Sequence, residues 1–330
     1  MANFIPKTMN IELTTACPLQ CPQCYCSLIG GKHIDLQTAK FWIKEAAAND
    51  VVQIMLSGGE TLCYPHIYEI VAAASKYCEV VNIALSGFDF TQDVLDGLIK
   101  AGVSGIFISL NGSTEKINAF SRDGYYLAID ALQLLSDNKF PNIWINWVMH
   151  SSNADDFANI IEISEKYNVK HLVVMAFKPD SANNLLTIPT KSQMHNVRDI
   201  IKAYKGNVKI LLEPCFSPML ALISETKLFG NLNVGKNKGC GAGRDTFSIN
   251  VDGNLSPCRH LDYFEEHTSL EDYWNNSPIL KRLREIEDDK REPCSSCYYS
   301  DYCRHCLAIN AKMKGELYIG NETCPLQTPL

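Results

Sequence analysis

Cysteines are the residues of this chain whose spacing points most directly to chemistry. Cys17, Cys21 and Cys24 form a C-x3-C-x2-C pattern. Three thiolates on one short loop can hold three irons of a cubane [4Fe–4S] cluster and leave its remaining iron open to another ligand. A structural zinc loop is the alternative, although zinc usually takes a complete protein ligand set and paired cysteines.

A second group of seven cysteines lies after residue 239. The spacing is C-x12-G-x4-C, then C-x2-C-x5-C-x2-C after a gap, and then one more cysteine. The group comprises Cys240, Cys258, Cys294, Cys297, Cys303, Cys306 and Cys324. Seven thiolates exceed the needs of one tetrahedral site and suit two cubane clusters. A pair of zinc knuckles is the alternative.

The composition favours metal ligation over disulfide bonding. The chain has 14 cysteines among 330 residues, and its N-terminus lacks the pattern of a secretory signal. Thiols rarely pair in a reducing cytosol, so we expect a cytoplasmic metalloprotein. No apolar run is long enough for a membrane span. The net charge of −7 argues against a nucleic-acid-binding protein.

The elements that must position these cysteines alternate along the first two thirds of the chain. Strands are expected at Met9–Leu13, Val52–Leu56, Val80–Leu85, Gly105–Leu110, Ile143–Met149 and His171–Phe177. Helices are expected at Leu36–Ala48, Ile67–Lys76, Gln92–Ala101, Tyr125–Ser136, Ala154–Tyr167 and Lys191–Tyr204. Six βα units predict a parallel sheet covered by helices, either open and doubly wound or curled into a partial barrel. In either fold the active site lies where the strands end.

The last third of the chain follows a different pattern. A seventh apolar run, Val208–Leu212, is followed by a Gly/Asn/Lys-rich linker at 230–240. Asp252-Gly253 predicts a hairpin turn, and the stretch 269–287 predicts one helix. So small and cysteine-rich a segment is expected to depend on metal sites for its fold.

The first cysteine pattern resembles that of radical S-adenosylmethionine (radical SAM) enzymes. In that family a SAM-bound cluster generates a 5′-deoxyadenosyl radical on a partial (β/α)6 TIM-like barrel. The resemblance implies that Gly58, Gly59 and Glu60 form the motif that contacts the SAM amino group. It assigns further SAM contacts to Ser86, Ser109, Asn111 and Arg122. Gln23 replaces the family's aromatic residue or histidine near the adenine, and Tyr25 could compensate.

The second cysteine group resembles the SPASM extension of radical SAM enzymes, which carries two auxiliary [4Fe–4S] clusters. The resemblance places the radical SAM barrel at 1–205, a bridging segment at 206–235 and the SPASM domain at 236–330. It assigns Cys240, Cys258 and Cys306 to the nearer cluster. The remaining four, Cys294, Cys297, Cys303 and Cys324, go to the outer one, and the total is three clusters.

The nearer cluster is then one ligand short, because Val234 stands where some family members have a cysteine. Its iron is either open to substrate or bound by Cys215 or a non-cysteine group. Cys215 could also donate a hydrogen atom to a substrate radical, or it could be a core thiol. Other polar residues at strand ends could line a substrate cavity, although each is commonly a solvated loop residue. They are Asp89, Asn111, Asn146, His150, Lys178 and Asp180.

The resemblance implies an oxidoreductase that matures a ribosomally made peptide. The product would be a crosslinked, dehydrogenated or epimerised peptide, and the electron donor a flavodoxin or ferredoxin. Cys17 lies near the start of the chain, so a separate leader-recognition protein or leaderless recognition is expected. A small-molecule enzyme, such as a sugar or aminocyclitol dehydrogenase or epimerase, is the alternative. A non-catalytic zinc or iron–sulfur binding protein is the alternative from another class.

Overall fold

The computed structural model describes residues 5–24, 31–179, 186–216, 239–300, 303–321 and 324. The chain divides into two units. Unit 1 contains residues 1–109, 123–144 and 242–284, and unit 2 contains residues 110–122, 145–241 and 285–330.

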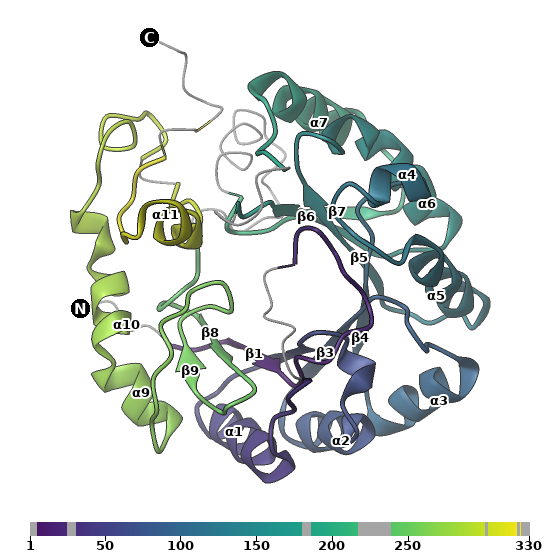
Figure 1. Cartoon of the computed structure of the whole chain (residues 1–330), viewed down its shortest axis with the longest axis horizontal. Coiled ribbons are helices and arrows are strands. Elements are labelled where there is room, and N and C mark those ends of the chain that lie inside the picture. The colour runs from purple at the N-terminus through teal and green to yellow at the C-terminus, as the bar shows by residue number, and fades with distance from the viewer. Residues whose placement is uncertain are drawn as a thin grey trace. The chain divides into compact units, whose positions relative to one another are not determined.

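The sheet of unit 1 begins with four parallel strands. They are β1 (Thr8–Glu12), β2 (Gln53–Ser57), β3 (Val80–Leu85) and β4 (Gly105–Ser109), and each pairs with the next. The helices of this part are α1 (Leu36–Ala48), α2 (Ile67–Tyr77), α3 (Gln92–Ala101) and α5 (Tyr125–Asp137), with a short 3-10 helix, η1 (Thr61–Cys63). Helices α1, α2 and α3 lie along one side of these strands (Figure 1).

The strands form because their apolar residues can be buried under those helices. Ile11, Ile54, Leu56 and Ile83 are fully buried. The intervening loops cap the helices with polar side chains. Asp35, for example, accepts a hydrogen bond from the backbone N–H of Thr38 at the start of α1 (2.9 Å). The predicted alternation of strand and helix is confirmed for strands β1 to β4 and the helices that follow them.

A C-terminal hairpin belongs to the same sheet. Strand β8 (Thr246–Ile249) pairs in parallel with β1 and antiparallel with β9 (Leu255–Ser256). Gly253 in the connecting turn has φ of 82°, which confirms the predicted hairpin. The strand order in unit 1 is β4-β3-β2-β1-β8-β9, so its last strand does not close onto its first.

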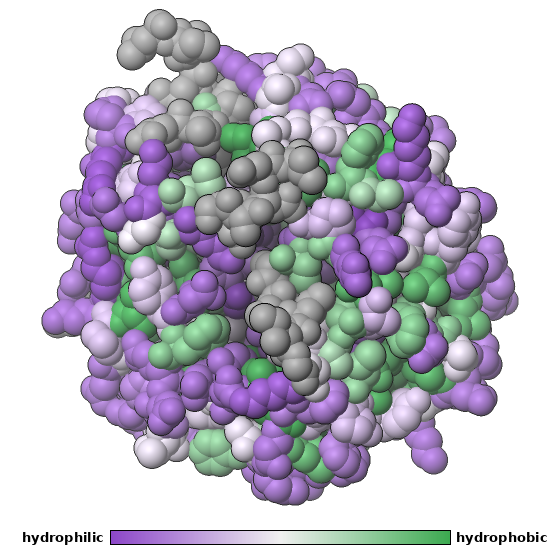
Figure 2. Space-filling view, in the orientation of Figure 1, coloured by the Kyte–Doolittle hydropathy of each residue, from purple (hydrophilic) through white to green (hydrophobic). Residues whose placement is uncertain are grey.

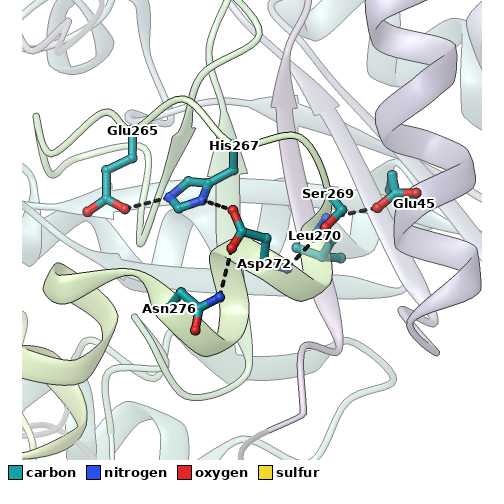
Figure 3. Close-up of polar contacts among 7 residues, drawn as sticks. All are labelled: Glu45, Glu265, His267, Ser269, Leu270, Asp272 and Asn276. Atoms are coloured by element: carbon teal, nitrogen blue, oxygen red, sulfur yellow. Dashed lines mark hydrogen bonds and ion pairs between the residues drawn. The ribbon is translucent and has the colours of Figure 1, made fainter.

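The single helix predicted at 269–287 is wrong. The structure has α9 (Leu270–Asn276) and α10 (Pro278–Arg284). Pro278 has no backbone N–H to continue the first helix, and the Ser277 hydroxyl accepts a hydrogen bond from the backbone of Leu280 (3.2 Å) to begin the second. Helix α9 is joined to α1, because the backbone N–H of Leu270 donates to Glu45 (2.8 Å; Figure 3).

Unit 2 contains most of β5 (Ile143–Met149), followed by β6 (His171–Ala176) and β7 (Lys209–Leu212), in the order β7-β6-β5. β7 covers most of the seventh apolar run and pairs with β6 in parallel, a pairing that the sequence analysis did not predict. Its helices are α4 (Glu115–Asn118), α6 (Phe157–Lys166), α7 (Lys191–Ala203) and α11 (Leu307–Lys314), with 3-10 helices η2 (Ala154–Asp156) and η4 (Ile286–Asp288). The predicted linker at 230–240 lies outside the described residues except for its last two positions.

Large exposed hydrophobic side chains are scattered over several elements. Phe41, Tyr68, Ile99, Phe120 and Tyr126 are examples from four helices and one loop. The visible face is largely hydrophilic, with apolar side chains in separate small groups (Figure 2). Isolated apolar residues of this kind are normal on protein surfaces. Within the described residues, no helix is long and apolar enough to cross a membrane.

Candidate functional site

The first cysteine loop follows β1 directly. Burial raises the pKa of the Cys17 thiol to about 11, a backbone hydrogen bond from Leu19 opposes this shift, and the charges of Glu60, Cys21 and Cys24 add to it. The three thiols and the Glu60 carboxylate are therefore electrostatic neighbours. A bound iron cluster would supply the positive charge that this group of acidic side chains lacks.

The donor set of this loop suits a cubane iron–sulfur cluster. Its three thiols come from eight consecutive residues, and a cubane binds each thiolate through a different iron. Cys17, Cys21 and Cys24 are therefore the residues that would hold the predicted cluster.

The loop after β2 is bound to the segment that leads into Cys17. The backbone N–H of Gly59 donates to the carbonyl of Thr14 (2.7 Å), and that of Glu60 donates to Ala16 (2.8 Å). A Cβ at Gly58 would lie 2.4 Å from the Thr14 oxygen, and one at Gly59 would lie 2.4 Å from the Ala16 oxygen. Glycine is required at both positions because two backbones pass in contact.

Glu60 joins the second loop to a third. Its side chain is 1% exposed and accepts hydrogen bonds from the backbone N–H (2.9 Å) and hydroxyl of Ser86 and from the backbone of Leu62 (3.3 Å). Three predicted SAM-site segments, the cysteine loop, the glycine-rich loop and Ser86, are thereby brought together. Ser86 lies at the end of β3, where the sheet topology requires a site residue.

Asn111, another predicted SAM contact, is engaged within the protein. Its side-chain amide donates to the Ser121 hydroxyl (2.8 Å), and its side-chain oxygen accepts from the backbone of Val148 (3.0 Å). Asn118, which the sequence reasoning missed, accepts from the Asn111 backbone (2.8 Å) and donates to the carbonyl of Arg122 (2.8 Å). The polar residues of this turn hold one another in place.

The remaining predicted SAM contacts are placed as follows. Ser109 is the last residue of β4, at the expected end of the strand. Arg122 follows α4 and is held through its backbone by Asn118, whose carbonyl accepts from the Arg122 N–H (2.7 Å). Tyr25 lies outside the described residues, as does Cys26.

A charged pair near the cysteine loop was missed by the sequence reasoning. Burial raises the pKa of Glu12, and the charge of Arg259 opposes this shift while that of Asp262 adds to it. The Arg259 guanidinium also interacts electrostatically with Cys24. The only sequence signal for Arg259 is its position directly after Cys258, a predicted cluster ligand.

A second thiol group occurs in unit 2. The Cys215 thiol is hydrogen-bonded to Cys240 and Cys306, and these bonds, together with burial, raise its pKa well above the usual value. Cys240 and Cys306 are 3% and 1% exposed. Arg304 fixes Cys240 from both sides: its carbonyl accepts from the Cys240 N–H (2.8 Å) and its guanidinium donates to the Cys240 carbonyl (2.9 Å). Three distant stretches of sequence thus present thiols to one place.

Cys258, the other predicted ligand of the nearer cluster, lies after β9 in unit 1. Its sulfur accepts a hydrogen bond from the backbone of His260 (3.4 Å), and its carbonyl accepts one from the Ser256 hydroxyl (2.9 Å). Backbone N–H groups commonly donate to cluster sulfur atoms, which makes this arrangement compatible with ligation.

The outer group also lies within unit 2. Burial raises the pKa of Cys294, a backbone hydrogen bond from Asn321 opposes this shift, and the charge of Cys297 adds to it. The N–H of Cys324 donates to the carbonyl of the same Asn321 (3.1 Å), so the last cysteine belongs to the turn that reaches Cys294. Cys303 lies between Cys297 and this turn in the sequence, and its N–H donates to the carbonyl of Tyr299 (3.0 Å).

Comparisons with known proteins agree with this arrangement. The chain matches the model of the Radical SAM superfamily over residues 11–163 and the model of SPASM, an iron-sulfur cluster-binding domain, over residues 240–298. It is 28% identical to the PqqA peptide cyclase of Ruegeria pomeroyi, in an alignment that covers 88% of this chain and 79% of the cyclase.

Two solved structures share its fold. SuiB of Streptococcus suis bound to S-adenosylmethionine has a TM-score of 0.79 at 18% identity, covering 98% of this chain and 78% of SuiB. The protein anSMEcpe with bound AdoMet and a peptide has a TM-score of 0.74 at 14% identity, covering 97% and 94%. These matches confirm the predicted fold class, a partial (β/α)6 barrel with a small iron–sulfur domain. The first match covers Cys17, Cys21 and Cys24, and the second covers Cys240, Cys258, Cys294 and Cys297, so residues 11–163 are a Radical SAM domain and residues 240–298 are a SPASM domain.

Proposed function

We propose that this protein cleaves SAM reductively and uses the resulting radical to modify a ribosomally made peptide. The curated relative is named for cyclisation of a peptide, and SuiB has been solved with its precursor peptide SuiA. The modification is a crosslink, a dehydrogenation or an epimerisation. The first two of these are net oxidations, which would make the protein an oxidoreductase.

The observation that carries this proposal is the hydrogen-bonded assembly of three loops around the first cysteine group. Cys17, Cys21 and Cys24 would hold a cluster whose open iron binds SAM. A cluster and SAM bound there would supply the radical chemistry that removes a hydrogen atom from substrate. Glu60 would bind the SAM ammonium, because its buried carboxylate is already oriented by Ser86.

The other SAM contacts proposed are Gly58, Gly59, Ser109, Asn111, Arg122 and Tyr25. Arg122 suits the SAM carboxylate, since a guanidinium pairs with a carboxylate through two parallel hydrogen bonds. Asn111 would act mainly by holding the turn before Arg122, because its own side chain bonds to Ser121 and to the backbone of Val148.

The auxiliary clusters would be held by two ligand sets. Cys240, Cys258 and Cys306 form the first set, and we propose Cys215 as its missing member because its thiol bonds to two of them. The second set is Cys294, Cys297, Cys303 and Cys324. These clusters would carry an electron away from the oxidised substrate. A flavodoxin- or ferredoxin-type partner would donate the electron that reduces the SAM-binding cluster. A separate leader-recognition protein is a further proposed partner.

The test begins with anaerobic reconstitution, reduction by dithionite with SAM, and quantification of 5′-deoxyadenosine and iron. Three cubane clusters predict about 12 irons per chain. Zinc in place of iron would overturn the proposal, as would a fully iron-loaded protein whose spectrum does not respond to SAM.

The peptide assignment needs its own measurement. A peptide encoded beside the gene is incubated with the loaded protein and analysed by mass spectrometry. Loss of a hydrogen pair indicates a crosslink or dehydrogenation, and deuterium uptake from heavy water without that loss indicates epimerisation. Turnover of a sugar or aminocyclitol with no binding of the peptide would instead identify a small-molecule enzyme.

A further inference from the structure

A largely buried ion pair lies at the ends of β6 and β7 in unit 2. The side chains of Lys178 and Glu213 are 7% and 17% exposed, and the Lys178 ammonium lies 2.9 and 3.0 Å from the two carboxylate oxygens of Glu213. The ammonium also donates to the carbonyl of Ala176 (3.1 Å). The Glu213 carboxylate accepts in turn from the Ala176 N–H (3.0 Å). Both charges are therefore held in one fixed arrangement.

This ion pair is joined to the thiol group defined by Cys215, Cys240 and Cys306. Cys215 is two residues after Glu213, in a turn closed by a hydrogen bond from the Phe216 N–H to the Glu213 carbonyl (2.8 Å). The Lys178 ammonium interacts electrostatically with the thiols of Cys306 and Cys215. The cation and the thiols of Cys306 and Cys215, which are proposed to bind iron, are therefore electrostatic neighbours.

The Glu213 carboxylate compensates the charge of the Lys178 ammonium, because both of its oxygens lie within hydrogen-bond distance of the nitrogen. An apolar pair of similar volume often stabilises a fold as well as a buried ion pair does. A charge beside proposed cluster ligands can instead act on the cluster electrostatically.

This electrostatic effect follows from the charge change of an iron–sulfur cluster. Accepting one electron makes the cluster more negative by one charge, so a nearby fixed cation stabilises the reduced form more than the oxidised form. Net charge and hydrogen bonding around a cluster are the main means by which a protein sets its reduction potential. We propose that Lys178, fixed by Glu213, raises the reduction potential of the cluster bound by Cys215, Cys240 and Cys306. This inference rests on the proposed function, because it requires a cluster at these thiols.

The test measures reduction potential directly. The SAM-binding cluster is removed in the full-length chain by changing Cys17, Cys21 and Cys24 to alanine, so that only auxiliary clusters contribute to the electron paramagnetic resonance signal. Anaerobic redox titration then compares this background with Lys178→Met and with Glu213→Gln added to it. Lys178→Met should lower the midpoint of one cluster, and Glu213→Gln, which leaves the cation with less compensation, should raise it.

A matched control separates this local effect from overall charge. Lys209, an exposed residue at the opposite end of β7, is changed to methionine. Lys209→Met removes the same charge as Lys178→Met and should leave both midpoints unchanged. The cluster concerned is identified as the one whose signal is altered by Cys215→Ser.

Iron content separates the two proposals. Absence of auxiliary iron from the background protein would overturn the proposed auxiliary clusters and this inference together, whereas SAM cleavage by the unaltered protein tests the proposed function separately. Full iron content with midpoints unmoved by Lys178→Met and Glu213→Gln would overturn the inference alone. If Lys178→Met loses iron, the midpoint and iron content of Glu213→Gln distinguish an electrostatic role of the pair from a purely structural one. Loss of iron in both variants would show that the pair only supports the fold, and would also overturn the inference.

Discussion

The two best-described thiol groups of this protein are built in opposite ways. Cys17, Cys21 and Cys24 come from one short loop, and their support is backbone hydrogen bonding to the glycine-rich loop. Cys215, Cys240 and Cys306 come from three separate stretches. Arg304 bonds to the backbone of Cys240, and the ammonium of the Lys178–Glu213 ion pair interacts electrostatically with Cys306 and Cys215. A local group can be recognised from spacing, whereas a group assembled from distant residues requires the fold.

The difference also bears on what each group can do. The first loop is partly exposed, with Cys24 on the surface, which suits a cluster that must admit SAM. Cys240 and Cys306 are buried, and a charged pair of fixed geometry lies beside the group they form with Cys215. Such a setting suits a site that holds and passes electrons, because burial and fixed charges set a reduction potential.

The largest expected effect comes from removing a thiol of the first group. Cys17→Ala should lower iron by about four per chain and reduce 5′-deoxyadenosine to background, because the SAM-binding cluster loses one of three ligands. Iron analysis and chromatographic quantification of the nucleoside measure both. Cys78→Ala, which removes a buried thiol outside both groups, is the control and should change neither. Normal SAM cleavage by Cys17→Ala would refute the assignment of this loop.

The second prediction concerns the assembled group. Cys215→Ala should lower iron by up to about four per chain, since one auxiliary cluster loses a ligand, while 5′-deoxyadenosine formation persists. Iron content, nucleoside yield and peptide product are measured on the same sample. Full iron content with loss of product would instead make Cys215 a hydrogen-atom donor. Unchanged iron and unchanged product would leave it as a core thiol.

The third prediction tests the backbone contact that supports the first group. Gly59→Ala places a Cβ 2.4 Å from the Ala16 carbonyl oxygen, and overpacking of this kind costs about 1–3 kcal/mol. The free energy of unfolding should fall, and SAM cleavage with it, because the residues leading into Cys17 must move. Gly315→Ala adds a Cβ in open space, so it tests backbone strain alone and should leave SAM cleavage intact. Equal SAM cleavage in both variants would remove the proposed role of this contact.

The smallest effect is expected at His267, which belongs to neither thiol group. Its two ring nitrogens lie 2.9 Å from Glu265 and 2.7 Å from Asp272 (Figure 3). Burial lowers the pKa of His267, but the hydrogen bonds and charges of Asp272 and Glu265 raise it above the ordinary value. Its contribution to stability is therefore full below the unfolded pKa and is lost as the pH rises through the folded pKa.

His267→Gln should accordingly cost about 1 kcal/mol of unfolding free energy below about pH 6, with a smaller cost at alkaline pH. Denaturant unfolding at several pH values measures this difference, and SAM cleavage should not change. A cost that grows toward alkaline pH would contradict the assignment of a charged histidine.

Much of the fold followed from local patterns. Apolar β-branched runs and helical spacing located six strands and their helices to within a few residues, because burial of one face is encoded every second or every third to fourth position. The break between α9 and α10 was missed, although Pro278 and Ser277 carried the signal. The parallel pairing of β8 with β1 had no local signal at all, since it joins segments more than two hundred residues apart.

The candidate site also has features that local sequence patterns predicted and features that only the tertiary structure shows. The C-x3-C-x2-C pattern could be recognised from the sequence because a short loop keeps its own thiols close together. The glycine-rich motif could be recognised because glycines indicate a close contact between backbones. Three other features could not be recognised from the sequence: the contacts of Cys215 with Cys240 and Cys306, the Lys178–Glu213 ion pair, and the electrostatic interaction of Arg259 with Cys24. These contacts depend on which strand ends and turns meet in the fold. Hydrogen bonding and burial between residues far apart in the sequence decide which of them meet.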